Sequence, residues 1–436
     1  MLHNDLEKLS RYPFHMPGHK RNQKFGIIGS EIDITEIDGF DNLHSPARSI
    51  LQIENKLSEI YKSEKSFLLI NGSTVGILAS ILAVTNKNDT VIMARNCHQS
   101  VYNACFLNEL NPIYIEPEYN EIHGFYKDVK QSEIDSALQA DNNTAAVIIT
   151  SPTYEGYTSN INSPVPLIID AAHGAHFGFS DFPEYPKADI VISSLHKTLP
   201  ALTQTAVINV YNKKYIPKIK KYLDIIQTSS PSYVLMNSVS KCVEIIKKQP
   251  DLFDELSNNL NFFYDTQLKH LQFIKTDDIS KIIISTAYTN INGAALAEIL
   301  RSEYYIECEM ASINYIILMS SIGDEKSAFE KLKFALTEID GRLTKSETKT
   351  IAKPPVPLKK CNQHEINKAK MTEFNNSVKL ISGETVFAYP PDIPIIVKGE
   401  VISQEIINYI NISVENRINI ISESNLLPRY ILTKDD

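Results

Sequence analysis

A carboxylate and a lysine amine follow two apolar stretches that are typical of buried strands. Residues 167–169 lead into Asp170, and residues 190–193 are followed shortly by Lys197. In an open α/β sheet, the carboxyl ends of the strands form the ligand crevice. A lysine amine can form a Schiff base, and a carboxylate can keep a pyridine nitrogen protonated so that the ring accepts electrons. The pair therefore predicts a site for pyridoxal 5'-phosphate (PLP).

A polar turn further upstream fits the phosphate of such a cofactor. The apolar residues 67–70 run into Asn71-Gly72-Ser73-Thr74, and an apolar helix is expected to follow as far as Val84. The first turn of a helix presents free N–H groups and a partial positive charge, so it binds anions well. Ser73 and Thr74 are therefore candidate phosphate ligands, although capping of the helix by one of their hydroxyls is the commoner use of such residues.

His98 lies just beyond another expected strand, residues 90–94. A histidine in this place is either a structural residue with satisfied hydrogen bonds or a ring that stacks on the cofactor. The residue types alone leave both interpretations open.

The elements that must position these residues alternate between strands and helices. Over residues 55–210 this alternation predicts an α/β fold whose mostly parallel sheet is covered on both faces. From about residue 226 the pattern changes to that of a smaller α+β domain, and a proline-rich linker follows it. We expect an N-terminal arm, a large PLP-binding domain, a small α+β domain and a C-terminal domain, at residues 1–48, 49–225, 226–345 and 346–436.

Composition narrows the class of protein. The 436 residues carry a formal net charge of −9, which argues against nucleic acid or an anionic membrane as the partner. The N-terminus lacks the pattern of a signal peptide, and no apolar run is long enough to span a membrane. Five scattered cysteines without a C-x-x-C pair fit free thiols in a reducing compartment, so we expect a cytoplasmic protein.

Six motifs follow one another along the chain. They are His15-Met16-Pro17-Gly18-His19-Lys20, Asn71-Gly72-Ser73-Thr74-x-Gly76, Arg95-Asn96-x-His98, Pro152-Thr153-Tyr154-x-Gly156, Asp170-x-Ala172-His173-Gly174-Ala175-His176 and Ser194-x-His196-Lys197-Thr198-Leu199. With Tyr389-Pro390-Pro391-x-Ile393-Pro394 and Gly399-Glu400 near the end, they make nearly the whole chain resemble the Orn/Lys/Arg decarboxylase family. The fold of that family is that of aspartate aminotransferase (PLP fold type I, with a seven-stranded type of sheet).

The resemblance assigns roles to these residues. Lys197 would carry the Schiff base, Asp170 would pair with the protonated ring nitrogen, and His98 would stack on the ring. His196 or Lys197 would return a proton to the substrate after carbon dioxide leaves. The residues expected to surround the phosphate or the rest of the cofactor are Ser73, Thr74, Thr153, His173, Ser194 and His196.

The resemblance also implies the reaction, which is PLP-dependent decarboxylation of lysine, arginine or ornithine to an amine of the kind used in polyamine biosynthesis. It implies a homodimer with active sites at the subunit interface, in a short form without the N-terminal wing domain of larger members. An acid would bind the second cation of the substrate, and the sequence does not rank the candidates Glu36, Asp41, Asp392 and Glu400.

Two departures from the family pattern fall near the site. Ala171 follows Asp170 where the family often has glutamate, and Asp392 replaces the glycine of Pro-Pro-Gly-Ile-Pro, which removes the backbone freedom of glycine there. The chain is also somewhat short between Thr153 and Asp170. This shortness and the Asp392 departure, both on the substrate side, keep open a PLP-binding protein with altered catalysis and a regulatory role.

Other chemistries fit the sequence less well. Transamination is disfavoured. An aminotransferase would be expected to have an arginine in the small domain for the substrate α-carboxylate, but Arg301 and Arg342, the only arginines of residues 226–345, stand in no recognisable motif. A metal site at His173 and His176 is disfavoured because no partner motif accompanies them. We expect no metal.

Overall fold

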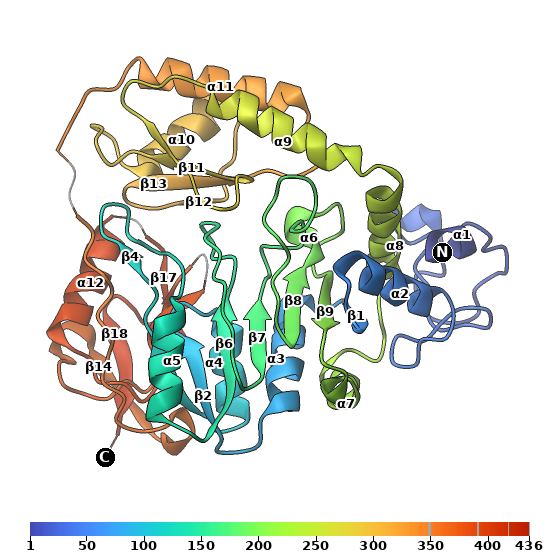
Figure 1. Cartoon of the computed structure of the whole chain (residues 1–436), viewed down its shortest axis with the longest axis horizontal. Coiled ribbons are helices and arrows are strands. Elements are labelled where there is room, and N and C mark those ends of the chain that lie inside the picture. The colour runs from blue at the N-terminus through green and yellow to red at the C-terminus, as the bar shows by residue number, and fades with distance from the viewer. Residues whose placement is uncertain (348–349, 390–391, 417, 436) are drawn as a thin grey trace. The chain divides into compact units, whose positions relative to one another are not determined.

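The computed structural model describes residues 1–347, 350–389, 392–416 and 418–435, so Pro390 and Pro391 of the late motif lie outside the described residues. The chain divides into two compact units (Figure 1). Unit 1 consists of residues 1–85, 164–258 and 321–323, and unit 2 of residues 86–163, 259–320 and 324–436.

Unit 1 has four strands of the large-sheet region and unit 2 has three. The strands of unit 1 are ordered β1-β9-β8-β7, and those of unit 2 are ordered β6-β2-β3. Their bounds are β1 Lys65–Leu69, β9 Ala206–Val210, β8 Ile190–Ser194, β7 Leu167–Asp170, β6 Thr144–Thr150, β2 Thr90–Ala94 and β3 Asn111–Ile115. The pairs β7–β8, β2–β6 and β2–β3 are parallel, whereas β9 runs antiparallel to β8 and β1.

Helices bury one stripe of side chains against the strands of unit 1. α3 (Gly72–Val84) packs on the strands of unit 1, and α7 (Ile216–Ile226) packs on α3. Gly76 allows this close approach, because an added Cβ would lie only 2.7 Å from Leu69 Cδ1 and 3.0 Å from Ile192 Cγ2. On the other side of β1, α2 (Ser49–Tyr61) packs next to α8 (Tyr233–Lys248), which also contacts α1 (Leu2–Leu6).

The free edge of β1 is covered by side chains instead of another strand. The N–H groups of alternate residues along this edge donate to side-chain oxygens. Ser66 donates to Ser58 Oγ at 2.8 Å, and Leu68 donates to Glu54 Oε1 at 3.2 Å. Ile70, just after the strand, donates to Gln227 Oε1 at 3.2 Å. Capping of this kind prevents the edge from pairing with another chain.

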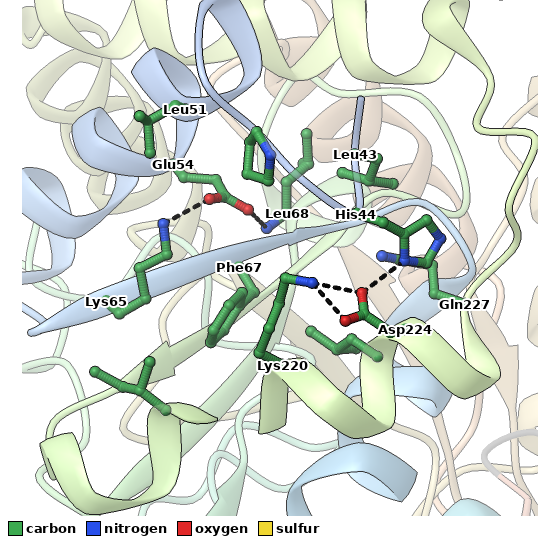
Figure 2. Close-up of a pocket in the computed structure, with 13 residues that line it drawn as sticks. Leu43, His44, Leu51, Glu54, Lys65, Phe67, Leu68, Lys220, Asp224 and Gln227 are labelled. Carbon is green, nitrogen blue, oxygen red and sulfur yellow. Dashed lines mark hydrogen bonds and ion pairs between the residues drawn. The ribbon is translucent and has the colours of Figure 1, made fainter. Parts of the chain in front are cut away.

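A cavity of about 250 Å³ lies along this edge, between α2, β1 and α7 (Figure 2). Its polar side chains already have partners. The Lys65 ammonium donates a hydrogen bond to Glu54 at 2.6 Å, and the Asp224 carboxylate accepts hydrogen bonds from His44 at 2.9 Å and from Lys220 at 2.5 Å. We therefore interpret these groups as supports of the strand edge.

Replacing Lys65 with methionine should destabilise unit 1. The Glu54 carboxylate is 3% exposed, and burial raises its pKa while Lys65 opposes that rise. Loss of the ammonium leaves a buried carboxylate without its partner, a change that costs about 3–5 kcal/mol. We expect a clear fall in the thermal unfolding midpoint of Lys65→Met. The double variant Glu54→Gln/Lys65→Met should recover much of it, and equal midpoints for the two variants would contradict this account.

Unit 2 contains a smaller sheet of order β10-β11-β13-β12 (Gln272–Ile274, Lys281–Ser285, Tyr315–Met319 and Met310–Ala311), against which α10 (Gly293–Tyr304) packs. α11 (Lys326–Asp340) follows β13 along the chain (Figure 1). Asp340 at the end of α11 accepts the N–H groups of residues 269–271 at 2.6–2.9 Å.

The last part of unit 2 has its own core. β15 (Val386–Ala388) pairs with β16 (Ile393–Ile396) and β17 (Ile420–Ser422), and β14 (Ala369–Glu373) pairs with β18 (Tyr430–Lys434). α12 (Gln404–Glu415) supplies Ile406, Ile407 and Ile410 to a cluster that also contains Phe374 and Ile396. The remaining helices and short strands of unit 2 are α4 Gln99–Leu107, α5 Gln131–Ala140, β4 Tyr119–Asn120 and β5 Phe125–Tyr126.

The large, mostly parallel sheet and the α/β class predicted from the sequence are confirmed. Helix α9 spans Asp251–Tyr264, and Asp340 accepts the N–H of Lys269 beyond its end. The fourfold division of the sequence into domains stays a prediction.

Candidate functional site

The carboxylate expected to hold a ring nitrogen lies at the end of β7. Asp170 is 3% exposed, and its Oδ1 accepts the N–H of Ala172 at 3.1 Å. The parallel register places Asp170 opposite Ile192 of β8, and Ala171 N–H donates to the Ile192 carbonyl at 2.8 Å. The ends of β7 and β8 are thereby fixed side by side, as the crevice of an open α/β sheet requires.

The lysine amine lies at the neighbouring strand end. Lys197 belongs to α6 (Leu195–Thr198), a single turn that begins where β8 ends. Its Nζ lies 2.9 Å from Nε2 of His173, which follows Asp170 by three residues and is 7% exposed. Unit 1 alone therefore brings together the predicted residues Asp170, His173 and Lys197.

The expected anion site opens α3 in the same unit. Ser73 and Thr74 lie within the first turn of the helix, so neither is the N-cap; that place belongs to Asn71, whose side chain makes no cap bond. The Asn71 Oδ1 instead accepts the N–H of Thr228 at 3.2 Å. Capping by Ser73 or Thr74 is thus not observed. The N–H of Gly72 donates to the Gln204 carbonyl at 2.8 Å, and the start of the helix carries the partial positive charge that favours an anion.

Buried hydroxyls near Lys197 fit a polar ligand. Within the described residues, Ser194 Oγ and Thr198 Oγ1 have no hydrogen-bond partner, although both side chains are buried. An unmatched buried hydroxyl is costly in a folded protein and calls for a partner. Together with the uncapped first turn of α3, these hydroxyls fit a cofactor that carries a phosphate.

His196 has a defined hydrogen bond and a lowered pKa. Its Nδ1 lies 2.8 Å from the carbonyl of Thr205, so Nδ1 carries the proton. Burial lowers the pKa of His196, and the neighbouring Lys197 adds to that effect. In its neutral form the other ring nitrogen, Nε2, is an acceptor. The lowered pKa favours this neutral form, in which Nε2 can accept a proton or a hydrogen bond but cannot donate one.

Two further predicted residues, His98 and Thr153, belong to unit 2. His98 is the N-cap of α4, and its Nδ1 accepts the N–H of Ser100 at 3.1 Å. Thr153 is 2% exposed and holds its own loop, because its Oγ1 accepts the N–H of Tyr157 at 3.2 Å. Their participation in one site with Lys197 stays a prediction.

A buried acid follows Thr153 by two residues. Glu155 is 7% exposed, and its Oε1 accepts the hydroxyl of Tyr315 at 3.1 Å. Burial raises the pKa of Glu155 to about 7, although the Tyr315 bond and the positive charge of Lys281 oppose the rise. The sequence offered no signal for this group beyond its place in the loop after β6.

The raised pKa of Glu155 should make stability depend on pH. The folded state keeps the proton up to about pH 7, whereas the unfolded chain releases it near the ordinary pKa of 4.5. Stability is therefore lost as the pH rises from about 4.5 to 7, by at most about 3 kcal/mol. We expect the unfolding midpoint of Glu155→Gln, relative to that of the natural chain, to rise across this range and to level off above it. Parallel midpoint curves would contradict the assignment.

The candidates for the distal substrate cation are not equivalent. Asp41 accepts the N–H groups of Ala47, Arg48 and Ile50 at 2.7–2.9 Å, so it anchors the start of α2. Glu400 forms a buried bidentate pair with Arg95 at 2.9 and 3.0 Å. Asp392 lies near His98. Only Glu36 among the four has a buried carboxylate oxygen, Oε1, without a hydrogen-bond partner in the described part of the chain.

The two arginines considered for a transaminase are engaged on the surface. Arg301 pairs with Glu298 and Glu307, and Arg342 pairs with Glu303. Neither is held ready for a substrate carboxylate, which weakens the transaminase alternative.

Among the described residues, no group of three or more histidine, cysteine, aspartate or glutamate side chains could hold a metal ion. No helix in the same residues has the length and apolar character needed to cross a membrane.

Comparisons with known proteins agree with this geometry. The family model described as "Orn/Lys/Arg decarboxylase, major domain" matches residues 4–276. The chain is 30% identical to the uncharacterized protein YaaO of Bacillus subtilis, over 90% of this chain and 89% of that protein. It is 26% identical to a Bacillus anthracis protein named arginine decarboxylase, over 94% of this chain and 92% of that protein.

Among solved structures, the constitutive lysine decarboxylase of Escherichia coli superimposes with a TM-score of 0.83 at 17% identity, over 100% of this chain and 81% of that one. This likeness confirms the fold type I expected from the sequence. The family match covers β7, β8 and the Asp170, His173 and Lys197 cluster, and the predicted membership is confirmed: the chain belongs to the Orn/Lys/Arg decarboxylase family of enzymes.

Proposed function

We propose that the protein catalyses the PLP-dependent decarboxylation of a basic amino acid, with Lys197 as the residue that binds the cofactor covalently. The observation that carries the proposal is the cluster in unit 1, where the Lys197 amine lies 2.9 Å from His173 and Asp170 ends the adjacent parallel strand. Membership of the Orn/Lys/Arg decarboxylase family supports the same conclusion.

The chain supplies each group that such a cofactor needs. The cofactor, when bound, provides a pyridine ring that takes up the electrons left when carbon dioxide departs. Asp170 is proposed to keep the ring nitrogen protonated. The first turn of α3, with Ser73 and Thr74, and the hydroxyl of Ser194 are proposed to bind the phosphate, and His98 is proposed to stack on the ring.

Proton transfer falls to His196 and Lys197. When it is not bound to the cofactor, the Lys197 amine would lie beside the reacting carbon, where it can hold a proton. Its contact with His173 holds the amine in place. His196, whose pKa burial lowers, gives up a proton readily once it is charged. Either residue can protonate the carbon from which the carboxylate has left.

Arginine is the first substrate to test, because the relatives of that name match over most of their length. Lysine and ornithine are the alternatives. We propose that Glu36 binds the second cation of the substrate, since its buried oxygen has no partner among the described residues.

A homodimer in the cytoplasm completes the proposal. Large apolar side chains lie exposed along the N-terminal segment, including Phe14 at 93% and Ile28 at 100%. Several large apolar side chains exposed within one short segment suit an interface with a second copy of the chain. The five free cysteines fit a reducing compartment.

A product assay tests the function. The protein, loaded with PLP, receives equal amounts of L-arginine, L-lysine and L-ornithine, and amines are identified by mass spectrometry. One new amine, absent when the cofactor is removed and restored when it is returned, would establish the reaction and name the substrate. A protein that holds PLP and yields no amine would refute decarboxylation of these substrates and would favour the regulatory alternative.

A further inference from the structure

His98 lies at one of two contacts between a loop and a hairpin of unit 2. The loop of residues 95–98 follows β2, and the hairpin is formed by β15 and β16. At one contact, Arg95 bonds both carboxylate oxygens of Glu400 and also the Ile395 carbonyl at 3.1 Å. At the other, the N–H of Gln99 donates to the Asp392 carbonyl at 3.0 Å.

The first contact is rigid. Arg95 and Glu400 are buried, and Glu400 Oε2 also accepts the N–H of Val397 at 2.7 Å. The rings of Tyr102 and Tyr114 lie 5.7 and 4.8 Å from the guanidinium carbon. A bidentate, fully bonded pair of this kind fixes geometry well. The position of Asp392 relative to His98 is therefore set by the fold and not by the side chains alone.

The two nitrogens of His98 have different partners. Nδ1 accepts the N–H of Ser100 and lies 2.8 Å from Ser100 Oγ. The proton of the neutral ring is therefore on Nε2, and that nitrogen lies 3.6 Å from Asp392 Oδ2. This distance is longer than a hydrogen bond, and the two side chains are 37% and 24% exposed, so the carboxylate acts on the ring through its charge while Nδ1 is bonded at the start of α4.

The backbone of Asp392 explains how an acid occupies this place. Its φ is +63°, in the left-handed region where the family motif has glycine. Aspartate tolerates this region better than most residues with a side chain, so Asp392 adopts a φ that glycine would also adopt. The substitution therefore adds a carboxylate next to His98.

We propose that Asp392 is a positioning residue that fixes the orientation of the His98 ring, whose tautomer the N–H of Ser100 sets. The inference rests on the proposed function, because the value of a fixed His98 ring lies in its contact with the cofactor. Asp392 acts through His98 and is not assigned to the substrate cation.

Two variants separate the effect of the Asp392 carboxylate from the effect of the backbone conformation at this position. Asp392→Gly keeps the positive φ and removes the carboxylate, whereas Asp392→Asn keeps the φ and an oxygen that can accept from Nε2. Asn425→Gly is the matched control, since Asn425 is an exposed residue of unit 2 with a φ of +57°.

The first readout uses the protein without cofactor, by ¹⁵N NMR of labelled histidine with His98→Gln to assign the signals. The natural chain should show His98 protonated at Nε2 only. Asp392→Gly should keep this tautomer, because the N–H of Ser100 still donates to Nδ1, but it should shift the Nε2 signal of His98 more than Asp392→Asn or Asn425→Gly does. Unchanged His98 signals in Asp392→Gly would overturn the proposal.

The second readout is the visible circular dichroism and the dissociation constant of bound PLP. We expect Asp392→Gly to change the dichroism band and to raise the dissociation constant about threefold to tenfold, as the loss of one such contact implies. Asp392→Asn should restore most of both. An unaltered band and constant in Asp392→Gly would also count against the proposal. If the natural chain binds no PLP, the proposed function fails, while the NMR result still decides the role of Asp392.

Discussion

Replacing Lys197 with alanine should abolish decarboxylation. The change removes the amine that holds the cofactor and also a candidate donor of the proton that ends the reaction, so we expect the rate to fall by at least about a thousandfold. His173 would lose its partner at 2.9 Å, but the strand ends at Asp170 and Ser194 would keep their backbone bonds. The measurement is the rate of amine production under saturating PLP.

A chemical experiment locates the bond independently of the rate. Reduction with borohydride should add the mass of the cofactor to the peptide that contains Lys197, and Lys197→Ala should show no such adduct. Lys187→Ala is the matched control, because Lys187 lies on the surface of the same unit with 87% of its side chain exposed. An adduct on another lysine, or full activity of Lys197→Ala, would refute the assignment.

The strands of the large sheet could be predicted because buried parallel strands are nearly continuous apolar runs. Residues 167–169 and 190–193 fall in strands, and the polar residues after them lie at the strand ends as expected. The antiparallel course of β9 could not be predicted from its composition, since Ala206–Val210 is apolar and buried like its neighbours. Its direction depends on the path of the chain from Lys197, which carries no local pattern.

Side-chain partners were the harder part of the site. The motifs identified His173 and Lys197 as neighbours of a cofactor, but their mutual contact arises only when β7 and β8 pair. The four candidate acids could not be ranked from the sequence, because Asp41 and Glu400 are engaged by groups several to hundreds of residues away. The raised pKa of Glu155 likewise comes from burial, which depends on the packing of the whole unit.

The second large effect is expected for Asp170→Asn. The asparagine has the same shape, and its oxygen can still accept the N–H of Ala172, so the end of β7 should keep its structure. The variant lacks the buried negative charge proposed to stabilise a protonated ring nitrogen. Loss of one preorganised electrostatic partner in a buried site lowers kcat by about 10²–10³-fold, and we expect a fall of this size. Because Lys197 remains, the borohydride adduct should still form.

Asp189→Asn is the control that distinguishes loss of a carboxylate at the proposed site from loss of a carboxylate that only supports the strands. Asp189 precedes β8 and accepts the N–H of Leu167 at 3.0 Å and the amide of Asn212 at 2.7 Å, so it lies at the other end of the same two strands. Its replacement should lower the unfolding midpoint without changing kcat. If Asp170→Asn and Asp189→Asn lowered kcat equally, the effect would reflect strand stability, and Asp170 would lose its assigned role. A fall confined to Asp170→Asn, with PLP still bound to Lys197, would show that the chemistry depends on the carboxylate at the crevice end of β7.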